Sequence, residues 1–312
     1  MVIAAYNLSQ TNRVPYVTQT EVLQSAIANN VDFSNLIENG DDAQQAAALQ
    51  EMIVRASTKV DVTCFGYAGT LCASVSVENG RYYPNRLGQF IIHPEYWPIL
   101  EVRTFSNGWG PGTSMAAVNL TPQNCSIERT QFIVTSQGSN TAVPGVGLSS
   151  VISGGFGGYT QFCEYTYVNG FANTFLSGDP DAGDMFITVN PSPGSTSPVG
   201  IYPGMPLTIW DAQYDEGVIV DPSYNGTSTT VPIVTPLLYD HVAGTNVSAI
   251  PSTIKSAVIH FIVDECVERG QVGISLGAMG AVTADASGGK SSNHEAKAYD
   301  LLDEFQSYWG RS

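Results

Sequence analysis

The chain has 312 residues, of which 43% are hydrophobic, and its formal net charge is −16. This composition is ordinary for a globular protein with a sizeable core, so bulk disorder is excluded. The acidic balance argues against nucleic-acid binding, which depends on Lys and Arg that neutralise phosphates. We expect no secretory leader, because the apolar run at residues 1–6 is too short, and no membrane-spanning helix.

Local signals define two N-terminal helices. Thr18 and Glu21 form a capping box, in which each side chain satisfies a backbone N–H of the other residue, and a short helix through Ala28 is expected. A long amphipathic helix is predicted over residues 42–64, because its apolar side chains recur every three or four positions. Acidic residues lie at its positive end, and Gly66 is expected to end it.

Short β-prone runs separated by turn residues follow this helix, and they predict small sandwiches or barrels. The expected strands cover residues 71–77, 88–92, 99–105, 131–135, 160–167, 185–189, 207–210, 217–220 and 231–234. This part of the chain is strongly acidic, because no Lys or Arg occurs from Gln131 through Ile254. The turn-like residues near 177 and 245 suggest that residues 177–245 form a compact, removable β module.

A second amphipathic helix is predicted over residues 252–269, followed by a Gly-, Ala- and Ser-rich linker over 270–292. A last helix is expected over residues 293–309. It carries Phe305, Tyr308 and Trp309, residue types that dominate binding hot spots, so we expect an interface element. Truncation at Gly289 is accordingly expected to leave a folded protein.

These elements predict an α+β protein, with a helical frame from the N- and C-terminal segments and a large β-rich insertion. The expected domains are a helical core with short strands over 1–105 and 246–312, a β-rich region over 106–176, and the inserted module over 177–245. The two long helices are expected to pack on each other.

Few residue patterns in the sequence indicate chemistry. The four histidines lack metal-ligand spacing, and the five cysteines form no CxxC, so we expect neither a metal nor a cofactor. The glycines of 154–158 lack the GK[ST] ending of a phosphate loop. Asp211, Asp215 and Glu216 offer paired carboxylates for glycoside hydrolysis, but close acids on a β insert are more often solvated turn residues. We therefore expect a protein that is not an enzyme.

Four stretches resemble the head-to-tail adaptor, or head-completion, proteins of long-tailed bacteriophages. The segment 51–66 (EMIVRASTKVDVTCFG) looks like the family's long helix, and 85–90 with 99–102 resemble the two strands after it. The most distinctive stretch is 200–211 (GIYPGMPLTIWD), with 216–220, 236–241 and 244–247, which looks like a small β module inserted in many adaptors. Residues 250–258 (IPSTIKSAV) resemble the family's Pro-started second helix. The length of the β region, especially 106–160, departs from the family.

The resemblance implies a structural virion protein, made in the bacterial cytoplasm and located at the head–tail neck. It implies a ring of about twelve copies that docks under the portal, extends the DNA channel and offers a platform to a stopper or tail-terminator protein. DNA would pass through the ring without specific binding, since a wall of carboxylates repels phosphates. Candidate channel-lining acids are Asp41, Asp42 and Glu51. The candidate portal or subunit interface residues are Leu301, Leu302, Phe305, Tyr308 and Trp309.

A carbohydrate-binding or capsid-decorating β protein is the alternative. Four aromatic residues suggest a sugar platform, although cores and subunit contacts explain such residues more often. These residues are Trp109, Phe156, Tyr159 and Phe171.

Overall fold

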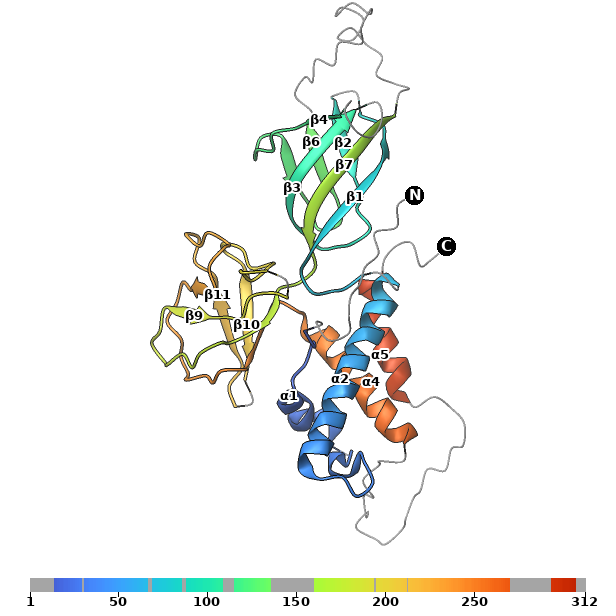
Figure 1. Ribbon diagram of the computed structural model, residues 1–312, viewed down its shortest axis with the longest axis vertical. Helices are drawn as coiled ribbons and strands as arrows, with labels where there is room; N and C mark the ends of the chain where they lie inside the picture. The colour runs from blue at the N-terminus through green and yellow to red at the C-terminus, as the bar shows by residue number, and fades with distance from the viewer. Residues whose placement is uncertain are drawn as a thin grey trace, which may run out of the picture. The chain divides into compact units, whose positions relative to one another are not determined.

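A computed structural model describes residues 14–29, 31–66, 69–85, 88–108, 115–135, 160–193, 195–211, 213–269 and 293–306. The chain is α+β, with helices and antiparallel sheets, and it divides into two compact units (Figure 1). One unit comprises 1–70 and 171–312, and the other comprises 71–170. The expected boundaries at 105/106 and 176/177 do not coincide with this division. The strands at 74–82 and 99–108 pair with the strand at 161–169, and the strand at 89–92 pairs with that at 132–135, so all three belong to the second unit.

The helices begin and end close to the residues that their capping signals predict. α1 covers Gln19–Gln24 with the expected Thr18–Glu21 capping box, and the 3₁₀ turn η2 at Ala26–Ala28 replaces its expected last turn. A second 3₁₀ turn, η3, covers Phe33–Asn35. α2 covers Asp42–Phe65 and ends at Gly66, whose φ of 73° suits a residue without a side chain.

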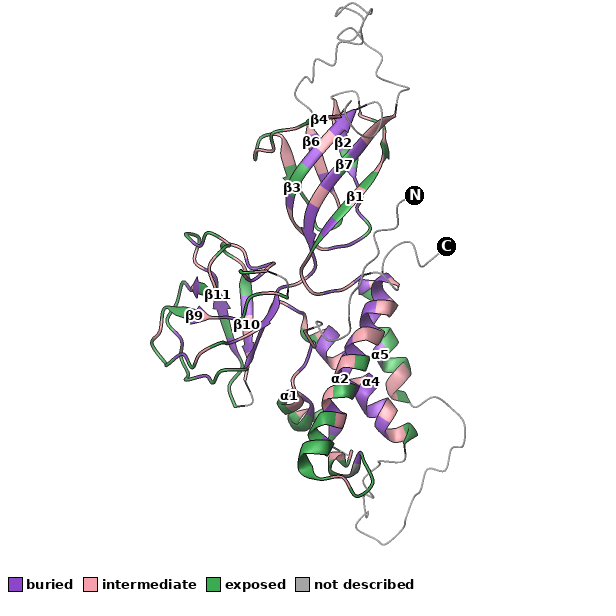
Figure 2. Cartoon of the chain, in the orientation of Figure 1, coloured by how far each residue is buried: buried purple, intermediate pink, exposed green. Residues whose placement is uncertain are grey.

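Two C-terminal helices complete the helical part of the first unit. α4 covers Ser252–Glu268 and α5 covers Asn293–Leu302, followed by the 3₁₀ turn η4 at Asp303–Phe305. α2 packs on α4, as the sequence predicted, and α5 packs on both (Figure 1). Figure 2 shows that α4 is buried over much of its surface, so this helix forms the centre of the helical packing.

The second unit is built from two antiparallel sheets. Their strand orders are β1-β7-β3-β4 and β2-β6-β5. The strands are β1 Ser74–Tyr82, β2 Gln89–Ile92, β3 Ile99–Gly108, β4 Met115–Ala117, β5 Cys125–Ile127, β6 Phe132–Thr135 and β7 Gln161–Asn169. Rings from both sheets meet in the core, because Phe132 of β6 contacts Phe105 of β3 and Tyr165 of β7 edge-on.

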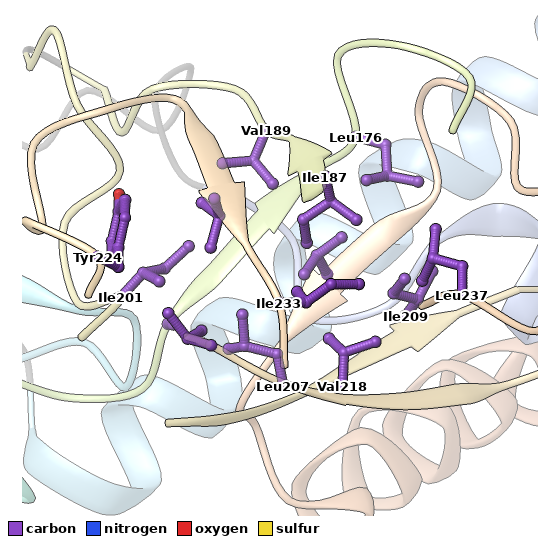
Figure 3. Packing of buried hydrophobic residues seen from close by; sticks show 14 residues of the cluster. Leu176, Ile187, Val189, Ile201, Leu207, Ile209, Val218, Tyr224, Ile233 and Leu237 are labelled. Atoms are coloured by element: carbon purple, nitrogen blue, oxygen red, sulfur yellow. The ribbon is translucent and has the colours of Figure 1, made fainter. Parts of the chain in front are cut away.

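A small β module completes the first unit. Its strand orders are β11-β10-β13-β8 and β12-β9. The strands are β8 Asn173–Phe175, β9 Phe186–Thr188, β10 Pro206–Trp210, β11 Glu216–Ile219, β12 Thr230–Pro232 and β13 Asn246–Ser248. Side chains of both sheets share one apolar cluster, which includes Val231 of β12. Figure 3 shows Ile187 of β9 and Ile209 of β10 in this cluster. The module therefore has a hydrophobic core of its own, and its strands begin at Asn173 and end at Ser248.

Candidate interaction surface

The candidate channel-lining acids lie at the surface of α2. Asp41 is the N-cap of this helix, and its carboxylate accepts the N–H of Gln44 at 2.8 Å. Asp42 is exposed in the first turn. Glu51 pairs with Arg55 at 2.5 Å one turn further on, so its charge is partly compensated. Within the described part of the chain, no ion pair joins Asp41 or Asp42 to a Lys, Arg or His.

The candidate interface residues of α5 are placed differently from what the sequence suggested. Leu302 and Phe305 are 0% and 2% exposed within the chain itself, and Leu301 is half-buried. Tyr308 and Trp309 lie outside the described residues. The apolar face of α5 packs on α4 and α2, so its buried residues cover the chain's own core. Leu302 and Phe305 thus offer no exposed surface to a partner, and the interface role of α5 stays a prediction.

A buried ion pair joins α1 to α4. Nζ of Lys255 donates to Glu21 at 2.5 Å and to Oδ1 of Asn246 at 2.9 Å, and it lies 4.4 Å from the centre of the Trp210 ring. Burial lowers the pKa of Lys255, whereas the neighbouring carboxylate of Glu21 acts in the opposite direction. The Lys255 side chain is only 5% exposed, so this cluster offers no open site. Its contacts hold the helices and the β module together.

Two carboxylates form hydrogen bonds with one buried imidazole in the β module. His241 is 2% exposed, and its Nδ1 lies 2.9 Å from Asp211 while its Nε2 lies 3.1 Å from Glu216. Both hydrogen bonds are satisfied at once when the ring carries both of its protons. The sequence offers Asp211 and Glu216 as a pair of hydrolytic carboxylates. In the structure, the His241 imidazole lies between them, and Glu216 is only 6% exposed. Their role here is to hold the loop that carries His241.

That loop presents apolar side chains to solvent. Oε1 of Glu216 accepts the N–H of Leu238 at 2.8 Å, yet the Leu238 side chain is 71% exposed. Tyr239 stacks on Tyr214 of the β10–β11 turn, with ring centroids 4.4 Å apart and an interplanar angle of 12°. These tyrosines are 39% and 52% exposed, and Val242 is 65% exposed. We call Tyr214, Leu238, Tyr239 and Val242 the tyrosine patch.

Acidic side chains fix the loops beside the tyrosine patch. Oδ1 of Asp240 accepts the N–H of Ala182 at 2.7 Å, and Oδ1 of Asp179 accepts the N–H of Ala243 at 2.6 Å. Both contacts tie the loop around 179–184 to the loop around 238–243. The apolar side chains are thus exposed on a loop that is anchored by buried and surface hydrogen bonds, which is the arrangement of a preorganised interaction surface.

This patch was not predicted from the sequence, in which Leu238 and Tyr239 lie within the segment 236–241 that resembles the adaptor family. The proposed sugar platform included other aromatics, of which Phe171 is half-buried and Trp109, Phe156 and Tyr159 lie outside the described residues. A signal was present in the sequence. Two apolar residues directly follow Pro236-Leu237 in a run bounded by Asp240, without the alternation of a strand.

Comparisons with known proteins found no match for this chain, whether among family models, curated proteins or solved structures. Within the described residues, no helix is long and apolar enough to cross a membrane. No group of three or more His, Cys, Asp or Glu residues suited to a metal ion occurs in the same part of the chain.

Proposed function

We propose that this chain is a structural virion protein, a ring-forming head-to-tail adaptor that docks under the portal of a long-tailed bacteriophage. The ring extends the DNA channel and offers a platform to a stopper or tail-terminator protein. In this proposal the N- and C-terminal segments form a helical frame, and the β-rich parts are insertions into it.

The packing of α2 on α4 is the observation that supports this proposal most directly. These helices come from the two ends of the chain, and the whole β region separates them in sequence. Arg55 of α2 pairs with Glu265 of α4 at 2.7 Å, and Nζ of Lys59 lies 4.3 Å from the centre of the Phe261 ring. A helical pair of this kind is what the resemblance of 51–66 and 250–258 to the adaptor family implies.

The charge of the chain is compatible with a DNA channel. At a net charge of −16, a ring of copies has a strongly negative field, and exposed carboxylates repel duplex phosphates. Asp41 and Asp42 are exposed at the start of α2 and are our candidates for the channel wall. DNA would then slide through without being captured.

Co-sedimentation with the portal tests this proposal. The purified chain is mixed with purified portal rings of the same phage and separated on a density gradient. We expect the chain to move with the portal, and we expect mass spectrometry to find it in purified virions. Chain that stays at the top of the gradient and is absent from virions would refute the adaptor role.

A matched pair of variants makes the co-sedimentation test specific. Phe261→Ala removes the ring that packs under Lys59 and loosens the helical frame, so portal binding should fall. Val77→Ser changes a side chain that is 60% exposed in the other unit and should leave portal binding unchanged. Equal binding by both variants would mean that the helical frame does not carry the interaction.

A further inference from the structure

The tyrosine patch exposes several large apolar side chains to solvent, and this exposure calls for an explanation. An exposed Leu or Val on its own is common at protein surfaces, but four large side chains from two adjacent turns form a group. Tyr214 and Tyr239 stack face to face, which restricts the rotamers of both rings before anything binds. Little conformational entropy is then lost when a partner covers them, and tyrosine is among the commonest hot-spot residues.

The charge around the tyrosine patch indicates which kind of partner surface would cover the patch. Residues 171–250 contain no Lys or Arg, and they contain eight acids. Asp179, Asp181 and Asp240 belong to the two loops that are tied together beside the patch, and all three are exposed. An apolar centre with a rim of carboxylates is complementary to an apolar centre with a rim of cations.

A second copy of this chain does not offer such a surface. Each copy carries a net charge of −16, so the acid-rimmed patch gains no long-range attraction from another copy, and copies in a ring would contact through other surfaces. Five of the eight described Lys and Arg residues already pair with a carboxylate of the same chain, namely Arg55, Lys59, Arg103, Lys255 and Arg269, which leaves only Arg81, Arg129 and Lys297 for a rim of cations. DNA and anionic membranes are excluded by the same sign of charge.

We propose that the tyrosine patch is a docking surface for a different protein, whose contact face has an apolar centre rimmed by Lys and Arg. Leu238 and Val242 insert into the apolar centre, the stacked tyrosines supply flat contact area, and Asp179 and Asp240 pair with the cations. Glu216 and His241 are positioning residues, because they hold the backbone of the loop and do not reach the partner. This proposal does not depend on the adaptor function; in an adaptor, the partner would be a neck protein.

A titration with a defined probe tests the docking surface. The probe is a synthetic amphipathic helical peptide with Leu and Trp on one face and Arg along both edges, and the matched control peptide has Glu in place of every Arg. The full chain is labelled at Leu and Val methyl groups and observed by NMR. We expect the Arg peptide to shift the methyl signals of Leu238 and Val242, and added salt to weaken this binding several-fold.

Variants of exposed residues connect the signal to the patch. Leu238→Ser with Tyr239→Ser should weaken binding at least about tenfold, while the methyl signals of buried Leu207 and Val218 stay in place and show that the module is folded. Asp179→Asn and Asp240→Asn keep an acceptor for the backbone but remove the charge, and they should reduce the salt dependence. Val77→Ser and Asp42→Asn are controls outside the module and should bind as wild type.

Four results would overturn the proposal. The first is equal binding of the Glu peptide, and the second is a set of shifts spread over acidic residues throughout the chain. The third is a broadening of the Leu238 signal that grows with protein concentration in the absence of peptide and that Leu238→Ser removes. The fourth is salt-independent binding of a glycan at the patch. The third result would mean that a second copy covers the patch, and the fourth that a sugar does.

Discussion

Nδ1 of His260 on α4 lies 2.9 Å from Nδ1 of His294 on α5. Two ring nitrogens share a hydrogen bond only if one of them is unprotonated, so at least one imidazole of the pair is neutral at this nitrogen. Burial lowers the pKa of both histidines, and the positive charge of Lys297 lowers each further. The contact between α4 and α5 is therefore adapted to neutral histidines.

This histidine pair predicts that acid loosens α5. The folded pKa of each histidine lies below its unfolded value of about 6.5, so the folded chain binds fewer protons than the unfolded chain. The stability from this pair is complete above the unfolded pKa of about 6.5 and is lost as the pH falls from there through the lower folded pKa. We expect the melting temperature to fall between about pH 7.5 and pH 5.5.

A double variant separates the two histidines from other titrating groups. His260→Phe with His294→Phe keeps two packed rings without a titrating group, and its melting temperature should change less over the same pH range. Asp264, Glu295 and Lys59 lie near the pair and remain in both proteins, so their contributions cancel in the comparison. His93→Asn, at an exposed position, is the control. A pH profile that the double variant leaves unchanged would contradict the prediction.

Leu49 of α2 is 3% exposed, so Leu49→Asp buries a charge without a partner. We expect the free energy of unfolding of the helical part to fall by about 3–5 kcal/mol. Ala47→Asp places the same carboxylate on the exposed side of α2 and should cost less than about 1 kcal/mol. Chemical denaturation followed by helical circular dichroism measures both variants. Similar midpoints would mean that Leu49 is not part of a packed core.

His241→Leu leaves the half-buried Asp211 and the buried Glu216 without the group that bridges them. Breaking a buried charged pair from one side commonly costs about 3–5 kcal/mol, so we expect the β module to open locally. Hydrogen exchange at the backbone amides of Leu238 and Tyr239, which Glu216 accepts, should accelerate more than exchange in α2. Unchanged protection of these two amides would show that the imidazole does not hold the loop.

Removing α5 should destabilise the chain, contrary to the expectation from the sequence. Ala298, Leu302 and Phe305 are at most 2% exposed, and without them apolar residues of α4 such as Phe261 lose their cover. Truncation at Gly289 should therefore lower the melting temperature or cause aggregation. Leu302→Asp should act in the same direction, and Ala296→Asp, at an exposed position, should not. If the truncated chain has the same melting temperature as the full chain, α5 does not stabilise the core, and its role as an interface element is favoured instead.

Local signals explain why most helices and strands could be predicted. The capping box of Thr18, the stop at Gly66 and the apolar period of α2 all depend on neighbours a few residues away. The four strands that were not predicted, β4, β5, β8 and β13, have three residues each, and β8 and β13 pair with each other from distant parts of the sequence. Strands this short lack a visible alternation, so their pairing could not be read from composition.

The tyrosine patch and the His241 cluster were harder to predict than the fold. Asp211 and Glu216 lie 30 and 25 residues from His241 in sequence, and no local pattern joins them. Leu238 has the residue type of a core position, yet its side chain is 71% exposed on a backbone that Glu216 anchors. The apolar face of α5 was predicted correctly. The sequence alone did not show whether this face would pack on the chain's own core or on a partner.

Electron cryomicroscopy of the chain bound to its portal tests the central claim most directly. The account predicts a closed ring of copies beneath the portal, with an open channel along the axis and with α2 and α4 packed on each other in every subunit. Portal particles without added density, or copies attached singly with no ring around the channel, would contradict it.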